Sequence, residues 1–156
     1  MKLYHGTNHD FHQINLAKSL PYKDFGRGFY LTDLEPQARR MAMRKASAFG
    51  GTPVVQQYQF DESRQTDGSL DVLQFEMPTI EWARFIFGNR SRETHFTHQY
   101  DIVIGPIADD GVAFLINQYQ SGAITIAQFA RMLKYRKLSR QYYFGTARAI
   151  KLLERI

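Results

Sequence analysis

Strand-like and helix-like segments follow one another in this chain without the regular strand–helix–strand alternation of a parallel sheet. β-branched and aromatic residues predict strands over 3–5, 29–32, 54–60, 70–75, 100–105 and 141–144. Apolar residues at three- and four-residue spacing predict helices over 35–49, from Thr79 to near Gly88, over 112–119, after Thr125 and after Thr146. We therefore expect an α+β fold and not a doubly wound parallel sheet.

The length and composition predict one globular domain. The chain has 156 residues and neither a repeat nor a linker, so we expect a single domain over residues 1–156. An apolar fraction of 44% is too high for a disordered chain. The absence of cysteine excludes disulfides and thiolate metal sites. No apolar run approaches the ~20 residues that span a bilayer, so we expect a cytoplasmic protein without a membrane partner.

The chain is basic, with a net charge of +5 and a pI of about 9.5. A positive surface raises the local concentration of polyanions, which include nucleic acids and dinucleotides. The plain alternative is a basic surface with no such role.

Familiar nucleotide and metal motifs are absent. The segment Gly26-Arg27-Gly28 lacks the third glycine of a dinucleotide fingerprint, and it precedes a strand where the fingerprint precedes a helix. The pairs His9/His12 and His95/His98 have suitable spacing but no evident third ligand, so we expect no metal site.

Two segments carry residues suited to a pyridine dinucleotide. Tyr4-His5-Gly6-Thr7 puts a histidine at a strand end beside a glycine whose backbone a ligand can approach. Gly26-Arg27-Gly28-Phe29-Tyr30 puts an aromatic residue on a strand after a cationic turn. A ring, a backbone amide and an imidazole suit nicotinamide and ribose. Each feature alone is also compatible with a core histidine, a core tyrosine or an ordinary turn.

These two segments, in this order and at this separation, resemble the first two signature motifs of the ADP-ribosyltransferases of the diphtheria-toxin and poly-ADP-ribose-polymerase branch. The resemblance implies a split β-sheet with an NAD cleft, flanked by helices. Over nearly its whole length the chain also resembles small bacterial domains of unassigned function that carry transferase-like motifs, through the segments 100–110 and 141–144. Such domains are thought to be toxins of toxin–antitoxin pairs, which implies a small antitoxin partner.

The resemblance also implies roles for individual residues. His5 would hydrogen-bond the adenosine ribose, the Gly6 backbone would hold the nicotinamide amide, and Tyr30 would stack on the nicotinamide ring. The third signature residue starts a late strand, which aligns it with Gln141. The expected catalytic residues are therefore His5, Tyr30 and Gln141. The expected cofactor-binding residues are His5, Gly6, Thr7, Arg27, Gly28, Tyr30, Thr32 and Met41, with Arg27 near the NAD phosphates.

The chain departs from the family pattern at two positions. The third signature residue is normally glutamate, and Gln141 keeps hydrogen bonds but not the charge that stabilises an oxocarbenium-like centre. The loss of such an electrostatic interaction costs roughly 10²–10³ in rate. Related enzymes without this glutamate still transfer single ADP-ribose units. Met41 stands where animal polymerases have a second stacking tyrosine, which implies a looser pocket and no polymer formation.

Three functions follow as hypotheses. The first is a mono-ADP-ribosyltransferase toxin that transfers ADP-ribose from NAD to a protein or nucleic-acid acceptor. The second is an inactive transferase fold that binds NAD, ADP-ribose or a partner protein. The third is a basic nucleic-acid-binding domain without an NAD site.

Further residues have both a functional and a plain interpretation. Arg90 would contact phosphate or be a surface charge, and Asp109 or Asp110 would face the acceptor or cap a helix. The basic segment 134–140 would contact the acceptor or the antitoxin, or would be a solvated helix end.

Overall fold

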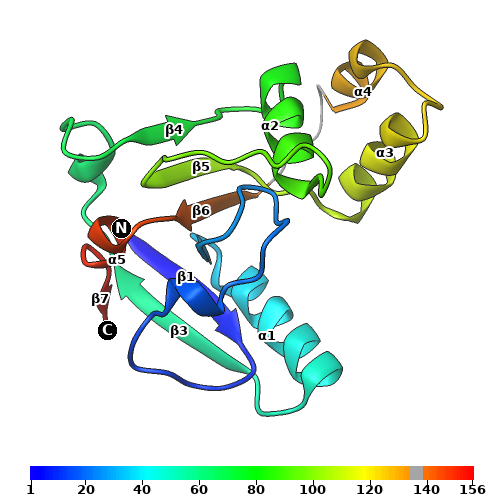
Figure 1. Ribbon diagram of the computed structural model, residues 1–156. Helices are drawn as coiled ribbons and strands as arrows, with labels where there is room; N and C mark the ends of the chain where they lie inside the picture. Colours follow the sequence, from blue (N-terminus) through cyan, green and yellow to red (C-terminus); the bar gives the residue numbers. More distant parts are fainter. Residues whose placement is uncertain (134–138) are drawn as a thin grey trace.

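A computed structural model of the protein describes residues 1–133 and 139–156. Within this part of the chain it contains one seven-stranded sheet, in the order β4-β5-β6-β2-β1-β3-β7, and five α-helices (Figure 1). The α+β class is confirmed. The strands are β1 (Lys2–Thr7), β2 (Phe29–Thr32), β3 (Val54–Gln59), β4 (Val72–Gln74), β5 (Ile102–Pro106), β6 (Arg140–Phe144) and β7 (Glu154–Arg155). The helices are α1 (Glu35–Phe49), α2 (Ile80–Arg90), α3 (Asp110–Gln120), α4 (Ile126–Leu133) and α5 (Ala147–Ile150), with 3-10 turns η1 (Leu16–Lys18) and η2 (Glu62–Gln65). None of the described helices combines the length and the apolar character that crossing a membrane requires.

Alternating side chains divide the sheet into two faces. Ile102 and Ile104 pack in one buried cluster, whereas Val103 between them packs in the other. On β6, Tyr142 and Phe144 pack in the same cluster as Ile102 and Ile104, and Tyr143 packs in the cluster of Val103. This period of two is the pattern expected for a sheet that is covered on both faces.

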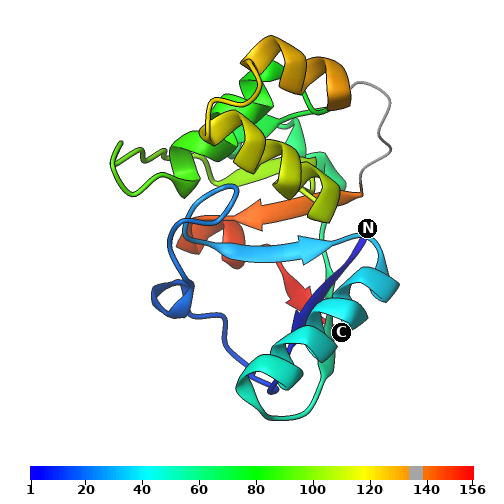
Figure 2. The same cartoon turned by 90° about the vertical axis from the view of Figure 1, so that its right-hand side faces the viewer.

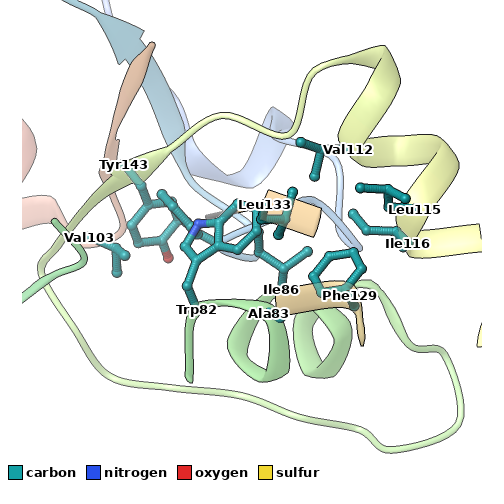
Figure 3. Close-up of a cluster of buried hydrophobic side chains, with 11 residues drawn as sticks. Trp82, Ala83, Ile86, Val103, Val112, Leu115, Ile116, Phe129, Leu133 and Tyr143 are labelled. Carbon is teal, nitrogen blue, oxygen red and sulfur yellow. The ribbon is translucent and has the colours of Figure 1, made fainter. Parts of the chain in front are cut away.

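Helices α2, α3 and α4 cover the face on which Val103 and Tyr143 lie (Figure 3). Their apolar side chains converge on Trp82, whose indole Nε1 donates to the carbonyl oxygen of Pro106 at 3.3 Å. A capping box precedes α4, as the residues Thr125 and Gln128 predict, because these two exchange side-chain to backbone hydrogen bonds of 2.8 and 3.2 Å. This helical layer fixes the end of β5 and, through it, the start of β6.

Two helices differ in extent from the sequence prediction. Helix α2 ends at Arg90, two residues beyond Gly88, and a Cβ at Gly88 would lie 3.0 Å from the Phe96 ring. That glycine therefore makes room for a ring and does not end the helix. The spacing of Ala147, Ile150 and Leu153 predicts a last helix that reaches Leu153, but α5 ends at Ile150. Strand β7 went unpredicted because two exposed residues carry no hydrophobic alternation.

Helix α1 lies directly on β1 because both elements have small residues where they meet. Ala38 and Ala42 are buried, and a Cβ built on Gly6 would lie 2.0 Å from the Ala38 carbonyl oxygen. Met41 and Phe49 also fall at the three- and four-residue spacing that predicts this helix, but they are 44% and 78% exposed. Only the alanine stripe packs on the sheet, and the rest of that side of α1 remains open.

The sheet has its shortest ladder between β1 and β2, which pair only through Tyr4 and Thr32. By contrast, β1 pairs with β3 through six residues, and β2 pairs with β6 through four. A long segment, residues 8–28, connects the two strands and reaches the start of β2, whereas α1 follows the other end of that strand (Figure 2). The opening between β1 and β2 is therefore bordered by this segment and by α1. The finer expectation of an ADP-ribosyltransferase-like split sheet stays a prediction.

The contact of Gly6 with α1 generates a stability prediction. We expect Gly6→Ala to lower the unfolding free energy by roughly 1–3 kcal/mol, because the added methyl meets helix backbone that cannot move aside. Chemical denaturation would measure the change. Gly68→Ala is the matched control, because no atom lies within 4 Å of a Cβ built on Gly68. The φ of Gly68 is +77°, so this variant should lose only the ~1 kcal/mol that alanine costs in a left-handed conformation. Equal losses in the two variants would contradict the packing explanation.

Candidate functional site

A cleft of about 1070 Å³ lies over the opening between β1 and β2. Its walls are α1 and the segment that connects the two strands. The cleft brings together the three expected catalytic residues, His5, Tyr30 and Gln141, although 136 positions separate the first from the last. It is also lined by the expected cofactor residues Gly6, Thr7, Gly28, Thr32 and Met41.

His5 bridges the opening in the sheet. Its Nδ1 lies 2.7 Å from the carbonyl oxygen of Tyr30. Burial and the nearby charge of Lys45 lower its pKa to about 3, so the ring is neutral at physiological pH. A carbonyl oxygen only accepts, so Nδ1 carries the proton and Nε2 is left as an acceptor. The ring of Phe29, at 4.4 Å between centroids, holds the imidazole in this orientation.

The sheet register puts the site residues on different faces. Tyr30 pairs with Tyr143, and Gln141 pairs with Thr32, so all four side chains share one face. His5 packs with Phe29 on the other face. His5 nevertheless lines the same cleft as Tyr30 and Gln141, because β1 and β2 separate beyond their single residue pair.

The hydroxyl group of Tyr30 both donates and accepts a hydrogen bond, and these two bonds anchor the side chain. The hydroxyl donates to the carbonyl oxygen of Gly26 at 2.7 Å and accepts from the backbone N–H of Phe25 at 3.0 Å. Burial raises the pKa of this phenol above its ordinary value, so it stays protonated. The Lys23 ammonium lies over the ring, 5.1 Å from its centroid. The exposed part of the ring is thus a cation-binding surface.

Gln141 is 8% exposed, and its amide is held by an acidic neighbour. Its Nε2 donates to the Asp24 carboxylate at 3.1 Å and lies 3.4 Å from the carbonyl oxygen of Pro106. The other oxygen of Asp24 accepts from Arg90 Nε at 2.7 Å. The sequence analysis did not identify Asp24, because its partners are distant in the chain. The one local signal that could have found it is its position just before the glycine turn 26–28.

The described lining is strongly cationic. It contains Lys18, Lys23, Arg44, Lys45 and Arg90 against one carboxylate, Asp24. Lys45 Nζ donates to the Gly6 carbonyl oxygen at 2.8 Å, and burial together with the charge of Lys23 lowers its pKa to about 8. Burial likewise lowers the pKa of Lys23. Two half-buried ammonium groups that repel each other favour an anion between them.

Other expected residues lie elsewhere or have structural roles. Arg27 is not part of the described lining, and its guanidinium donates to the Ala17 carbonyl oxygen at 3.2 Å. Thr32 Oγ1 accepts from the backbone N–H of Leu34 at 3.2 Å, which supports the start of α1. A Cβ on Gly28 would meet the Tyr143 ring at 2.1 Å, so this glycine is required by packing.

The residues with both a functional and a plain interpretation have different outcomes. Asp109 caps α3 by accepting from Val112 N–H at 2.8 Å, as its plain interpretation predicts. Arg90 is not a free surface charge, since it pairs with Asp24 inside the cleft. Residues 134–138 of the basic segment lie outside the described residues. The described chain contains no group of three His, Cys, Asp or Glu side chains placed to hold a metal ion.

The anchoring of Tyr30 generates a second stability prediction. Tyr30→Phe leaves the Phe25 amide without its acceptor, and we expect a loss of about 1–3 kcal/mol in unfolding free energy. Tyr119→Phe is the control, because its hydroxyl has no hydrogen-bond partner among the described residues and the ring contacts with Phe87 and Phe129 are kept in the variant. Thermal melts of both variants would measure the difference, and equal melting temperatures would show that the hydroxyl anchors nothing.

In a comparison with known families, the chain matches the family described as "Protein of unknown function (DUF3990)" over residues 1–155. Searches of curated proteins and of solved structures gave no significant match. The family model covers the sheet, the cleft and every residue discussed above. The chain therefore belongs to the DUF3990 family of proteins of unknown function.

Proposed function

We propose that the protein is an NAD-dependent mono-ADP-ribosyltransferase of the bacterial toxin type. The observation that carries the proposal is that His5, Tyr30 and Gln141 line one cleft, which lies where the sheet opens between β1 and β2. The motif resemblance predicted a split sheet and these three residues independently of the coordinates. The reaction would break the bond between nicotinamide and ribose and transfer ADP-ribose to a macromolecule.

The state of His5 suits a ribose. With Nδ1 donating to Tyr30, Nε2 is free to accept a hydrogen bond from a ribose hydroxyl. A neutral ring of pKa about 3 keeps this role over the whole physiological range. The cleft volume of about 1070 Å³ slightly exceeds the usual range of small-ligand sites, which leaves room for an extended dinucleotide.

The cations suit the pyrophosphate. Lys23 and Lys45 stand on opposite walls, one on the connecting segment and one on α1, with Arg44 beside Lys45. Two phosphate charges between them would offset the repulsion that lowers the pKa of Lys45. These side chains take the role that the sequence assigned to Arg27.

The ring of Tyr30 suits nicotinamide, but Lys23 must first leave its face. Nicotinamide in NAD is itself cationic, so it competes with the ammonium for the same aromatic surface. We expect Lys23 to move from the ring to the phosphates when NAD binds. Gly6 presents a similar competition, since Lys45 occupies the carbonyl oxygen that would accept from the nicotinamide amide.

The partners follow from the same resemblance. A toxin of this kind is paired with a small antitoxin protein, and its acceptor is a protein or a nucleic acid. The net charge of +5 favours an acidic surface on either partner.

The central prediction concerns NAD itself. Purified protein should bind NAD by calorimetry, release nicotinamide and label a macromolecule in a cell extract with ADP-ribose. His5→Ala should reduce turnover by roughly 10²-fold, by analogy with other single hydrogen-bonding groups in active sites. His12→Ala, an exposed residue outside the described lining, is the control. Folded protein that binds no NAD would remove the proposal.

The pKa of Lys45 predicts a pH dependence. An ammonium that binds phosphate must be protonated, and in the free protein its pKa is about 8. NAD affinity should therefore be constant below pH 8 and fall above it, by at most about tenfold per pH unit for one proton. Lys45→Met should weaken binding and flatten this decline, whereas Lys151→Met, an exposed residue outside the described lining, should change neither. An unchanged decline in Lys45→Met would contradict the assignment.

One observation favours a second function, a transferase fold that binds NAD or ADP-ribose without cleaving it. Gln141 is neutral where the related enzymes have a glutamate. Saturable NAD binding with no nicotinamide release in any extract would favour this alternative.

A further inference from the structure

We infer that Asp24 is the catalytic carboxylate of this cleft and replaces the charge that Gln141 lacks. The inference rests on the proposed NAD-cleaving function and adds to it a residue that the motif resemblance does not assign. Asp24 lies on the segment between β1 and β2, whereas the signature residue lies on β6.

Chemistry and position single out this side chain. Cleavage of the nicotinamide–ribose bond leaves positive charge on the ribose, and a nearby carboxylate is the usual stabiliser of such a centre. Asp24 is the one acidic residue in the described lining of the cleft. Its side chain is 13% exposed, and its Oδ2 lies 3.1 Å from Nε2 of Gln141.

The hydrogen bonds of Asp24 fix the position of its carboxylate and leave one lone pair for a further contact. Oδ1 accepts from Arg90, whose Nε and Nη2 lie 2.7 and 2.5 Å away. Oδ2 accepts from Gln141 alone among the described side chains. A carboxylate has about four lone-pair sites, so these three contacts leave one on Oδ2, the oxygen beside Gln141.

In the proposed step, the glycosidic C–N bond breaks heterolytically and its electron pair neutralises the pyridinium nitrogen of the departing nicotinamide. The ribose C1′ becomes cationic, and the Asp24 carboxylate stabilises that charge electrostatically. A lone pair of the acceptor's oxygen or nitrogen then forms the new bond to C1′. The acceptor proton passes to Asp24 and from there to water.

This arrangement explains why glutamine suits position 141. A glutamate there would put a second carboxylate in contact with Asp24, and like charges at that distance disfavour each other. The amide instead donates to Asp24 and orients it. Gln141 is thus matched to Asp24 as a hydrogen-bond donor.

A charge-exchange experiment tests the inference. We expect Asp24→Asn to lower kcat for nicotinamide release by roughly 10²–10³-fold while KM for NAD changes little. Gln141→Glu alone should not raise kcat, because it adds a repelling carboxylate. The double variant D24N/Q141E returns one carboxylate to the site and should recover at least about tenfold over D24N. Asp61→Asn is the matched control, a surface helix cap for which asparagine is equally suited.

The outcomes separate this inference from the proposed function. If the wild type cleaves NAD and D24N retains its kcat, or if Gln141→Glu alone raises kcat, the assignment of Asp24 is overturned and the transferase proposal stands. If the wild type does not cleave NAD, whether or not it binds NAD, both the assignment of Asp24 and the transferase proposal are overturned. Should D24N fail to fold, D24N/R90M removes both members of the ion pair and is compared with R90M for the same loss of kcat.

Discussion

The site depends on one hydrogen bond, from His5 Nδ1 to the carbonyl oxygen of Tyr30 at 2.7 Å. It links β1 to β2 where the backbone ladder between them has only the pair Tyr4–Thr32. A continuous ladder there would close the sheet and leave no cleft. With a side chain as the link, the strands part, and residues from both faces of the sheet reach the same space.

The neighbouring elements keep this opening in place. Helix α1 approaches β1 closely through Ala38, Ala42 and Gly6, so one wall of the cleft is fixed by packing. The other wall is tied by the Tyr30 hydroxyl to Phe25 and Gly26. Both walls are therefore set by buried contacts, and the groups that face the cleft remain for a ligand: Nε2 of His5, the ring of Tyr30 and the ammonium groups.

Local patterns predicted most of the secondary structure. β-branched and aromatic residues identified β2 and β6, and helical spacing identified α1, because each signal lies within one element. The close contact of His5 and Tyr30 was expected only through the motif resemblance. The structure supplies the physical basis of this contact, because β1 and β2 pair only through Tyr4 and Thr32.

The parts that escaped prediction depend on contacts between distant segments. Asp24 meets Gln141 across 117 positions, and Lys45 meets Gly6 across 39, so neither pair has a local signature. Gly28 was expected beside the dinucleotide, but the Tyr143 ring already requires a glycine there. Met41 and Phe49 match the helical period and are nevertheless exposed, since only the alanine stripe of α1 meets the sheet.

A crystal structure of the protein soaked with NAD tests the central claim most directly. The account predicts a ribose hydroxyl within hydrogen-bond distance of His5 Nε2, nicotinamide on the Tyr30 ring, and Lys23 displaced from that ring to the pyrophosphate. NAD bound at another surface, or a cleft in which Lys23 still covers Tyr30 at saturating NAD, would contradict it.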